Sequence, residues 1–531
     1  MEALSCWERR AHCCRRAHCA CLEERAKESR STASGPSAAF SFAALQASSP
    51  PHSSGAALAP SLRHSAPLPA ACSLASFSFA PRAGRSFLRS PFKGVAQGSW
   101  RRQAPEESPL PVPAMALARA VASLAPRVAG RRVAIGLSGG VDSAVSALLL
   151  LRAGASVSAA FARTWDAADE RGDSSECQLE RDFRDAQAVA SRLRIPLTRP
   201  ELVREYWTSV FEPFLSEYSA GRTPNPDLEC NRFVKFGSLQ DAALSSTGAD
   251  LFATGHYARL HFNSSSSQPH LFRGVDREKD QSYFLARTHS HQLSRAVFPV
   301  GSLTKEHVRE LARQHSLPTA EKKGSAGICF IGRRKMGDFL SRYIEMDPGT
   351  IVDVDTDEPL EYHSGSVKLT VGQKAGVGGA GAPYYVAWKC GSTVYAACGH
   401  NHPALFARGA VVDEGRWVSG EQAPFETSLP RDGGMESKER EAHFASKPRY
   451  RHPDVQCTLR RQRPGRLLAT FEQPVRAVTP GQALVVYKGE ECLGSCTILD
   501  SIPLTSPQRN DASSAADLEV SAGDRRAAAA T

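Results

Sequence analysis

The residues of this sequence best placed for covalent chemistry are two cysteines in basic, loop-like segments. Cys230 lies in GRTPNPDLECNRFVKFG, with three cations nearby along the chain: Arg222, Arg232 and Lys235. Nearby cations lower the pKa of a thiol and favour the nucleophilic thiolate. Cys329 lies in EKKGSAGICFIGRRK, again with glycines before it and basic residues on both sides. A lone cysteine would by default be a small buried hydrophobe, but two thiols in similar settings predict a pair that works by persulfide and disulfide exchange.

A loop of glycines and hydroxyls is the second chemical feature. The stretch RVAIGLSGGVDSAVSALLLLRAG (132–154) contains a short apolar strand, then SGGVDS, then an Ala/Leu-rich helix predicted over residues 142–153. The glycine pair lets the backbone approach a ligand, and the N-terminus of the helix points unpaired N–H groups at the same spot. With the hydroxyls of Ser138 and Ser143 this predicts a phosphate site. The spacing fits neither the Walker pattern GxxxxGK[ST] nor the dinucleotide fingerprint GxGxxG.

The elements that must position these loops alternate between strands and helices from residue 131 to 335. VAIGL, SVSAAFA and ADLFATGH have the composition of buried strands, and DFRDAQAVASRLRI has the spacing of an amphipathic helix. This alternation of strands and helices predicts an α/β fold, a doubly wound parallel sheet with helices on both faces. We expect a small central β-rich domain over 336–410, a polar loop insertion over 411–446, and a C-terminal antiparallel β-barrel over 447–500, where the apolar residues alternate. Residues 501–531 are expected to be a disordered tail.

The first 130 residues differ in composition from the rest of the chain. They carry 16 Lys or Arg against seven acids, and so supply +9 of the formal charge of +10. Global basicity therefore indicates no partner. Beyond residue 30 the leader is rich in Ser, Ala, Pro and Arg, which is typical of an organellar transit peptide with a disordered spacer. The alternatives are a plain disordered tail, or a shorter presequence formed by MALARAVASLAPRVAGRR (115–132) alone.

Cysteine usage and hydropathy indicate the kind of compartment in which the protein works. Six of the 14 cysteines lie in the leader, where AHCCRRAHCAC is too crowded for one tetrahedral zinc site, so we predict no metal there. The other eight have no disulfide-framework spacing and fit a reducing compartment. No run approaches the roughly 18 apolar residues of a membrane helix, so no membrane association is expected. The long leader favours a plastid and the segment 115–132 a mitochondrion, and the choice stays open.

The loop SGGVDS resembles the pyrophosphate loop of the N-type ATP pyrophosphatases, which cleave ATP to AMP and pyrophosphate to adenylate a carbonyl oxygen. A larger set of segments resembles the tRNA-specific 2-thiouridylases of that superfamily. The segments occur in the family's order and cover roughly residues 131–410 and 447–499: SGGVDS, GRTPNPDxxCN, ATGHYAR, DREKDQSYFL, FPVGSLTKxxVRxLA, GICFIG and AVTPGQALVVYKGEECLG.

The resemblance implies roles for particular residues. Cys230 would be the nucleophile, Cys329 the persulfide carrier, and Asp227 a third catalytic residue. ATP would be bound by Gly136, Leu137, Ser138, Gly139, Gly140, Val141, Asp142, Ser143, Ala162 and Gly255. The target base and other parts of the tRNA would be met by Asn225, Pro226, Asp227, Lys279, Asp280, Gln281, Arg449 and Tyr450. Basic clusters at 322–323 with 333–335, and at 447–451, would bind backbone phosphates.

The implied reaction converts the wobble uridine 34 of tRNA to 2-thiouridine. ATP, with Mg²⁺, would make the C2 oxygen a leaving group, and the persulfide sulfur would then displace AMP. The sulfur would come from a cysteine desulfurase or a carrier protein, and the enzyme would act as a monomer. Two alternatives stay open: another carbonyl-adenylating ligase, and a tRNA-binding homologue impaired in catalysis. The second arises because Gly324 and Ala326 replace the aspartate and threonine of the family's KDSTGICFIG.

Overall fold

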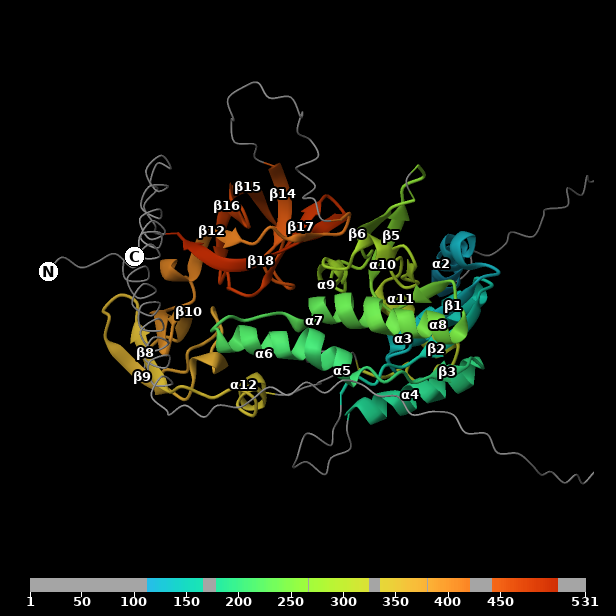
Figure 1. Ribbon diagram of the computed structural model, residues 1–531, viewed down its shortest axis with the longest axis horizontal. Coiled ribbons are helices and arrows are strands. Elements are labelled where there is room, and N and C mark those ends of the chain that lie inside the picture. The colour runs from blue at the N-terminus through green and yellow to red at the C-terminus, as the bar shows by residue number, and fades with distance from the viewer. Residues whose placement is uncertain are drawn as a thin grey trace, which may run out of the picture. The chain divides into compact units, whose positions relative to one another are not determined.

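The computed structural model describes residues 112–165, 178–265, 267–323, 335–379, 381–420 and 442–504 (Figure 1). The predictions for Cys329, Gly324 and Ala326, for the tail after residue 504 and for the leader before residue 112 lie outside these ranges. Among the helices in these ranges, none is both long and apolar enough to cross a membrane.

A five-stranded parallel sheet forms the first domain, in the order β3-β2-β1-β4-β7. Its strands are β1 (Arg132–Gly136), β2 (Ser156–Ala160), β3 (Leu197–Thr198), β4 (Leu251–Ala253) and β7 (Ala296–Val297). The chain runs from β1 to β2 and β3 on one side, then to β4 and β7 on the other. Ligands of such sheets bind where the strand order reverses, beyond the carboxyl ends of the strands. The predicted doubly wound sheet is confirmed, and this reversal lies at β1 and β4.

Helices of this domain follow the predicted pattern. The helix after SGGVDS is α3 (Val141–Arg152), and the amphipathic segment is α4 (Gln178–Leu193), which buries Leu179, Ala186 and Val189. The remaining helices of four residues or more in the described part of the domain are α5 (Val203–Tyr206), η2 (Trp207–Phe211), α6 (Glu212–Ser219), α7 (Pro226–Glu229), η3 (Cys230–Leu239), α8 (Gln240–Thr247), α9 (Ser282–Leu285), α10 (Ser290–Leu293) and α11 (Lys305–Gln314).

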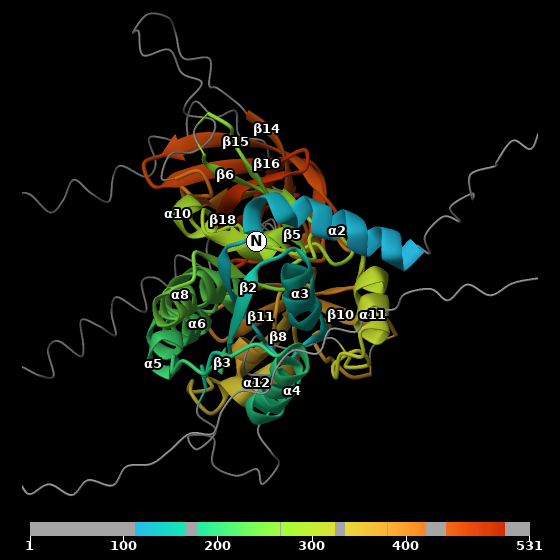
Figure 2. The same ribbon diagram turned by 90° about the vertical axis from the view of Figure 1, so that its right-hand side faces the viewer.

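The structure differs from the prediction just before β1. Residues assigned to a disordered spacer form helix α2 (Val112–Val128), which lies beside α3 and α11 (Figure 2). Ala120, Leu124 and Val128 recur every four residues and form one buried stripe against the domain core. Arg127 at the end of α2 donates to the carbonyl oxygens of Ser294 (2.8 Å) and Ala296 (3.1 Å). Apolar residues with arginines among them are also typical of a presequence, so this pattern fits both a presequence and a helix of the folded domain. Only the packing of α2 against the domain core distinguishes the two.

The central domain is a four-stranded sheet in the order β10-β11-β8-β9. It comprises β8 (Gly349–Asp353), β9 (Pro359–His363), β10 (Tyr384–Cys390) and β11 (Thr393–Cys398), and follows the short helix α12 (Met336–Leu340). The predicted small β-rich domain is thereby confirmed.

The C-terminal domain is a closed six-stranded antiparallel barrel in which β12 pairs with β18 to complete the ring. Its strands are β12 (Phe406–Val412), β14 (Ala442–Lys447), β15 (Val455–Arg463), β16 (Arg466–Arg476), β17 (Ala483–Lys488) and β18 (Glu491–Pro503), and the short β13 (Arg416–Trp417) also pairs with β18. The predicted barrel is confirmed, but its bounds differ. β12 and nearly all of β14 lie before residue 447, in the segments assigned to the central domain and the insertion, and β18 extends to Pro503 in the segment assigned to the tail.

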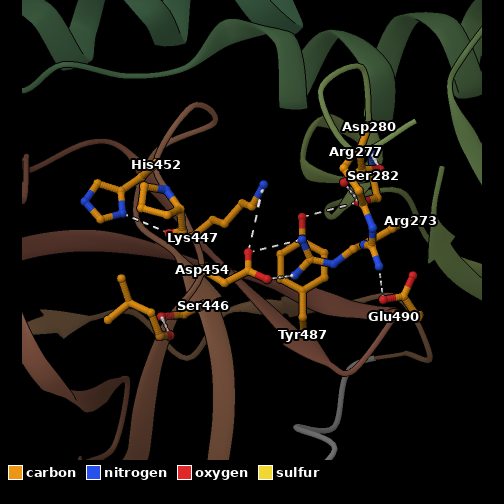
Figure 3. Close-up of polar contacts among 12 residues, drawn as sticks. Arg273, Arg277, Asp280, Ser282, Ser446, Lys447, His452, Asp454, Tyr487 and Glu490 are labelled. Carbon is orange, nitrogen blue, oxygen red and sulfur yellow. Dashed lines mark hydrogen bonds and ion pairs between the residues drawn. The ribbon is translucent and has the colours of Figure 1, made fainter. Parts of the chain in front are cut away.

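A hairpin of the first domain extends the barrel sheet. β5 (Ala258–Phe262) pairs with β6 (Pro269–Arg273), and β6 pairs with β18. Figure 3 shows the buried Arg273 guanidinium over the Tyr487 ring, 3.6 Å from its centroid, with Asp454 beside it at 2.9 Å. Because the Arg273 side chain is only 4% exposed, removal of its Asp454 partner would leave a buried charge without compensation. The first domain and the barrel are therefore joined by backbone pairing and by charge.

Candidate functional site

The nucleotide loop (residues 136–143) folds as a tight turn between β1 and α3. The Ser138 N–H donates to the Ser143 hydroxyl (3.2 Å), which itself donates to the Gly140 carbonyl (3.0 Å). Gly139 has φ +70°, and a Cβ there would overlap the backbone carbonyl of Asp182 on α4. The loop therefore requires glycine at this position. Its shape leaves the N-terminal N–H groups of α3 directed to one place, which suits phosphate.

The segments predicted to bind ATP meet at the carboxyl edge of the sheet. Gly136 ends β1, and Ala162 follows the end of the neighbouring strand β2, where it is buried. Gly255 follows β4, and a Cβ on it would lie 2.7 Å from the Ser143 nitrogen. The structure thus brings these three segments together, and Gly255 is needed for the close approach to the loop.

Two side chains that the sequence analysis did not single out contact Asp142 of the nucleotide loop. The Lys305 ammonium donates to both carboxylate oxygens, at 2.6 and 2.7 Å, and the Tyr257 hydroxyl donates at 2.7 Å. Burial and the Asp142 charge raise the pKa of Tyr257, which keeps its proton available for this bond. Lys305 belongs to the motif FPVGSLTK, and its place after a helix-capping threonine was the signal that could have identified it.

Lys322 also has a different role from the one predicted. Its ammonium donates to the Gly139 carbonyl at 2.9 Å and to Asp182 at 2.6 Å, and it contacts Asp185 as well. Burial lowers the pKa of Lys322, but the two carboxylates outweigh it and raise the pKa overall. In this structure Lys322 therefore supports the nucleotide loop, and its charge is already compensated rather than offered to tRNA phosphates.

The segment that carries the predicted nucleophile (residues 223–230, the nucleophile segment) leads into the short helix α7 and then into the π-helix η3. The Asn225 side chain accepts from the Asp227 N–H (3.1 Å), and Pro226 occupies the first position of α7, so both residues favour a helix start. Cys230 begins the π-helix η3 and is buried, with 1% of its surface exposed. π-Helical turns occur often at functional sites.

The cations near Cys230 in sequence have other partners in space. Arg222 makes two hydrogen bonds of 2.6 Å to Glu217, and Arg232 contacts the His289 ring nitrogen at 3.2 Å. Lys235 acts on His256, whose pKa it helps to lower. Arg222 and Arg232 are thus bound to side chains other than the thiol, and the effect of the three cations on Cys230 stays a prediction.

The helix η3, which begins at Cys230, packs directly on the carboxyl edge of the sheet, where the segments predicted to bind ATP meet. Phe236 of η3 lies 6.1 Å from the Phe252 ring and 5.8 Å from the His256 ring, measured between centroids. Leu239, at the end of η3, lies 3.7 Å from the position of a Cβ on Gly136. A shift of η3 would therefore displace the ends of β1 and β4. The nucleotide loop and Cys230 thus share one rigid core.

The residues predicted to contact tRNA differ in exposure. Lys279 is exposed, whereas Asp280 is buried and accepts hydrogen bonds from the Gly274 and Ser282 N–H groups at 3.0 and 3.1 Å. The Gln281 side-chain oxygen accepts from the Tyr257 N–H at 3.0 Å. The side chains of Asp280 and Gln281 are thus directed inward and shape the loop that carries Lys279, and their contact with tRNA stays a prediction.

Arg449 and Tyr450 lie where the barrel meets this loop. Arg449 donates to the Thr479 hydroxyl at 2.9 Å, and the Tyr450 ring packs 4.3 Å from Phe284, between centroids. Burial lowers the pKa of Arg449 and raises the pKa of Tyr450. Both side chains remain half-buried, so each keeps some surface for a ligand.

The buried His256 predicts a pH dependence of stability. Burial, reinforced by Lys235, holds its pKa well below 6.5, so the folded protein keeps it neutral while the unfolded chain protonates it. Stability is therefore lost as the pH falls below about 6.5. We expect His256→Gln to reduce the drop in urea midpoint between pH 7.5 and 5.5. His443→Gln, at an exposed histidine, should leave the drop unchanged; an equal effect of both variants would contradict the assignment.

Comparisons with known proteins agree with this arrangement. Three family models match in succession: the tRNA methyl transferase HUP domain over residues 131–333, the tRNA methyl transferase PRC-barrel domain over 337–393, and the aminomethyltransferase beta-barrel domain over 413–498. Among solved structures the likeness is low: the NMN synthetase from Francisella tularensis covers 43% of this chain and 86% of its own, at 19% identity and a TM-score of 0.26.

Similarity to curated proteins is much higher. The tRNA-specific 2-thiouridylase MnmA of Pectobacterium carotovorum subsp. carotovorum is 42% identical over 372 residues, which are 68% of this chain and 96% of that protein. The tRNA-specific 2-thiouridylase MnmA of Stutzerimonas stutzeri is 44% identical over 70% of this chain and 95% of that protein, and that of Salmonella typhimurium is 43% identical over 71% and 98%. The chain therefore belongs to the family of tRNA-specific 2-thiouridylases.

Proposed function

We propose that this chain adenylates the C2 carbonyl oxygen of the wobble uridine in tRNA and replaces that oxygen with sulfur from a cysteine persulfide. The observation that carries the proposal is the direct packing of the Cys230 helix on the nucleotide-binding edge, through Phe236 and Leu239. Sulfur transfer needs activation and attack at one carbon atom, so the two centres must be held together.

The proposed reaction balances as two displacements and one exchange. The uridine oxygen attacks the α-phosphorus of ATP, and pyrophosphate leaves. The terminal sulfur of the Cys329 persulfide attacks C2, and AMP leaves with the oxygen. The Cys230 thiolate then attacks the Cys329 sulfur, which releases the thiocarbonyl and forms a disulfide. A dithiol reductant restores both thiols, and a cysteine desulfurase or a sulfur carrier reloads Cys329.

The protein's own groups would hold the ATP phosphates. The N-terminus of α3 offers N–H groups, and we expect Lys305 to exchange its Asp142 partner for a phosphate when ATP binds, which also leaves the Asp142 carboxylate open. Among the described residues no cluster of three or more His, Cys, Asp or Glu could hold a metal. Mg²⁺ usually needs only one or two carboxylates with substrate phosphates, and Asp142 fits that role. The ion would neutralise phosphate charge.

The base-binding role is proposed for the segment that precedes Cys230. Asn225 and Asp227 lie at the start of α7, and one turn of helix separates them from the thiol. A wobble base is single-stranded and can be flipped out of its stack, so its edge is open to such side chains. Lys279, Arg449 and Tyr450 are proposed to contact other parts of the tRNA.

The Lys305→Met variant tests the phosphate role. Removal of a charge-assisted contact costs about 1.5–3 kcal/mol, which corresponds to roughly a 10- to 100-fold rise in the KM for ATP. The KM for tRNA should stay unchanged because Lys305 contacts the nucleotide loop. Steady-state AMP release measures both constants. Lys488→Met, at the exposed end of strand β17 in the barrel, serves as the control. An unchanged KM for ATP in Lys305→Met would rule out the contact.

Reconstitution tests the function as a whole. The full chain is incubated with ATP, unmodified tRNA and a cysteine desulfurase with cysteine, and thiolated uridine and AMP are measured. We expect both products in equal amounts. Tight tRNA binding without either product would favour the impaired homologue, and AMP formation driven by ammonia and a small acid would favour a ligase.

The leader is proposed to direct the chain to an organelle. Because α2 packs in the core of the first domain, we expect any cleavage to occur before residue 112. A fluorescent protein fused after residue 111 measures this, and a fusion that stays in the cytosol would contradict it.

A further inference from the structure

The C-terminal barrel binds the start of the nucleophile segment through one backbone carbonyl and one side chain of the barrel. The Thr223 N–H donates to the Pro480 carbonyl at 2.9 Å, and the Gln482 amide donates to the Thr223 carbonyl at 2.7 Å. Thr223 is buried. Both polar groups of the Thr223 backbone are therefore satisfied by the turn between β16 and β17, which lies more than 250 residues later in the chain.

Gly481 makes this close approach possible. It has φ +93°, and a Cβ on it would lie 2.8 Å from the Thr223 nitrogen and 2.9 Å from the Thr223 carbonyl carbon. Any other residue would both strain the turn and push the nucleophile segment away. The turn is thus shaped to receive Thr223.

Arg287 ties the other end of the segment to the barrel. Its guanidinium forms an ion pair with Glu229, the residue before Cys230. The same guanidinium donates to the Thr497 hydroxyl at 2.9 Å and to the Ser495 hydroxyl at 3.2 Å, both on β18. The side chains of Arg287 and Glu229 are only 13% and 22% exposed, so solvent screens the pair less than it would a surface pair.

A third contact lies between these two anchors. The Tyr283 hydroxyl donates to the Ala483 carbonyl of β17 at 2.9 Å, and a hydrogen bond with Asn225 acts on the same tyrosine. The segment that carries Asn225, Asp227 and Cys230 is thus bound to the barrel at its start, near its middle and at its end.

We propose that the barrel positions Cys230, with Gln482 and Arg287 as the positioning residues that hold residues 223–229 in one conformation. The inference rests on the proposed role of Cys230 as the attacking thiol. Neither residue needs to touch the reacting atoms. The barrel acts through the segment, because a short chain fixed at both ends has little freedom to move the thiol.

The test uses two conservative variants of the full chain and one matched control. Gln482→Glu keeps the size of the side chain but removes the amide donor to Thr223. Arg287→Lys keeps the charge but loses the planar fork that reaches Glu229, Ser495 and Thr497 together. Gln473→Glu makes the same chemical change as Gln482→Glu at an exposed position of β16 in the same barrel.

Three readouts separate positioning from other roles. Single-turnover thiolation at saturating tRNA and ATP reports the chemical steps, and the KM for tRNA reports binding. Alkylation of Cys230 by iodoacetamide in reduced protein without tRNA, resolved by peptide mass spectrometry, reports how firmly the buried thiol is held. In both variants we expect thiolation to slow about tenfold and alkylation to speed up about tenfold, with the KM for tRNA unchanged.

Each alternative result overturns the proposal. A raised KM for tRNA with unchanged Cys230 alkylation would make Gln482 or Arg287 a direct tRNA contact. Normal thiolation and normal alkylation would remove any positioning role, as would equal effects in Gln473→Glu. If the unaltered chain fails to thiolate tRNA, the proposed function falls, whereas alkylation still shows whether the barrel holds the segment.

Discussion

The Cys230→Ser variant is expected to lose tRNA thiolation by about 10³-fold or more, because a serine hydroxyl cannot release sulfur from a persulfide adduct. The position is buried, and serine has nearly the same size as cysteine, so the loss should not come from misfolding. Cys329→Ser should lose activity to the same extent, since each thiol has a separate step. Mass spectrometry of nucleosides from the reacted tRNA measures the loss.

A matched cysteine controls for general effects of the substitution. Cys398→Ser changes an exposed cysteine on β11 and should leave thiolation unchanged. In Cys230→Ser, pyrophosphate release should persist for one turnover, because adenylation needs only the nucleotide loop and the base. Normal thiolation by either Cys230→Ser or Cys329→Ser would disprove the two-thiol mechanism.

The second large effect is expected for Gly139→Ala. A Cβ at this position would overlap the Asp182 carbonyl, and the alanine would have to adopt φ +70°. The loop and α4 would therefore have to separate. A strained backbone and an overpacked contact together should lower the free energy of unfolding by about 2–4 kcal/mol. The displaced loop should also lose ATP-dependent AMP formation. Urea unfolding and AMP release measure the two losses.

The neighbouring glycine provides the control for this prediction. Gly140 has φ −96°, and a Cβ on it would meet only the Ser138 hydroxyl at 3.4 Å. Gly140→Ala should therefore leave the urea midpoint unchanged. If Gly139→Ala unfolds at the same urea concentration as Gly140→Ala, the close contact with α4 does not determine the shape of the loop.

Local patterns in the sequence predicted most of the secondary structure. The strand, glycine turn and helix of residues 132–154 are continuous in the chain, so their spacing alone indicates β1, the nucleotide loop and α3. The period-two segments after residue 449 likewise predicted β15 to β18. The same reasoning failed for α2, because an amphipathic pattern says nothing about what covers its apolar face.

Burial reversed several expectations about individual side chains. Asp280 lies in a charged, polar stretch, DREKDQSY, yet its carboxylate is enclosed by the loop that it organises. Lys322 lies in a basic run, yet it is compensated by Asp182 and Asp185 on another helix. A charge in a sequence shows that a partner is needed, but not whether the partner is RNA or the protein itself.

The sequence by itself determined the order of the motifs, the fold class and the chemistry that two cysteines and a phosphate loop can perform, because each of these depends on neighbouring residues. Tertiary structure alone decided which distant groups complete the site. Lys305 meets Asp142 across 163 residues, and Arg287 meets Thr497 across 210. Such contacts depend on how distant segments of the chain pack against one another, and no local spacing encodes that packing.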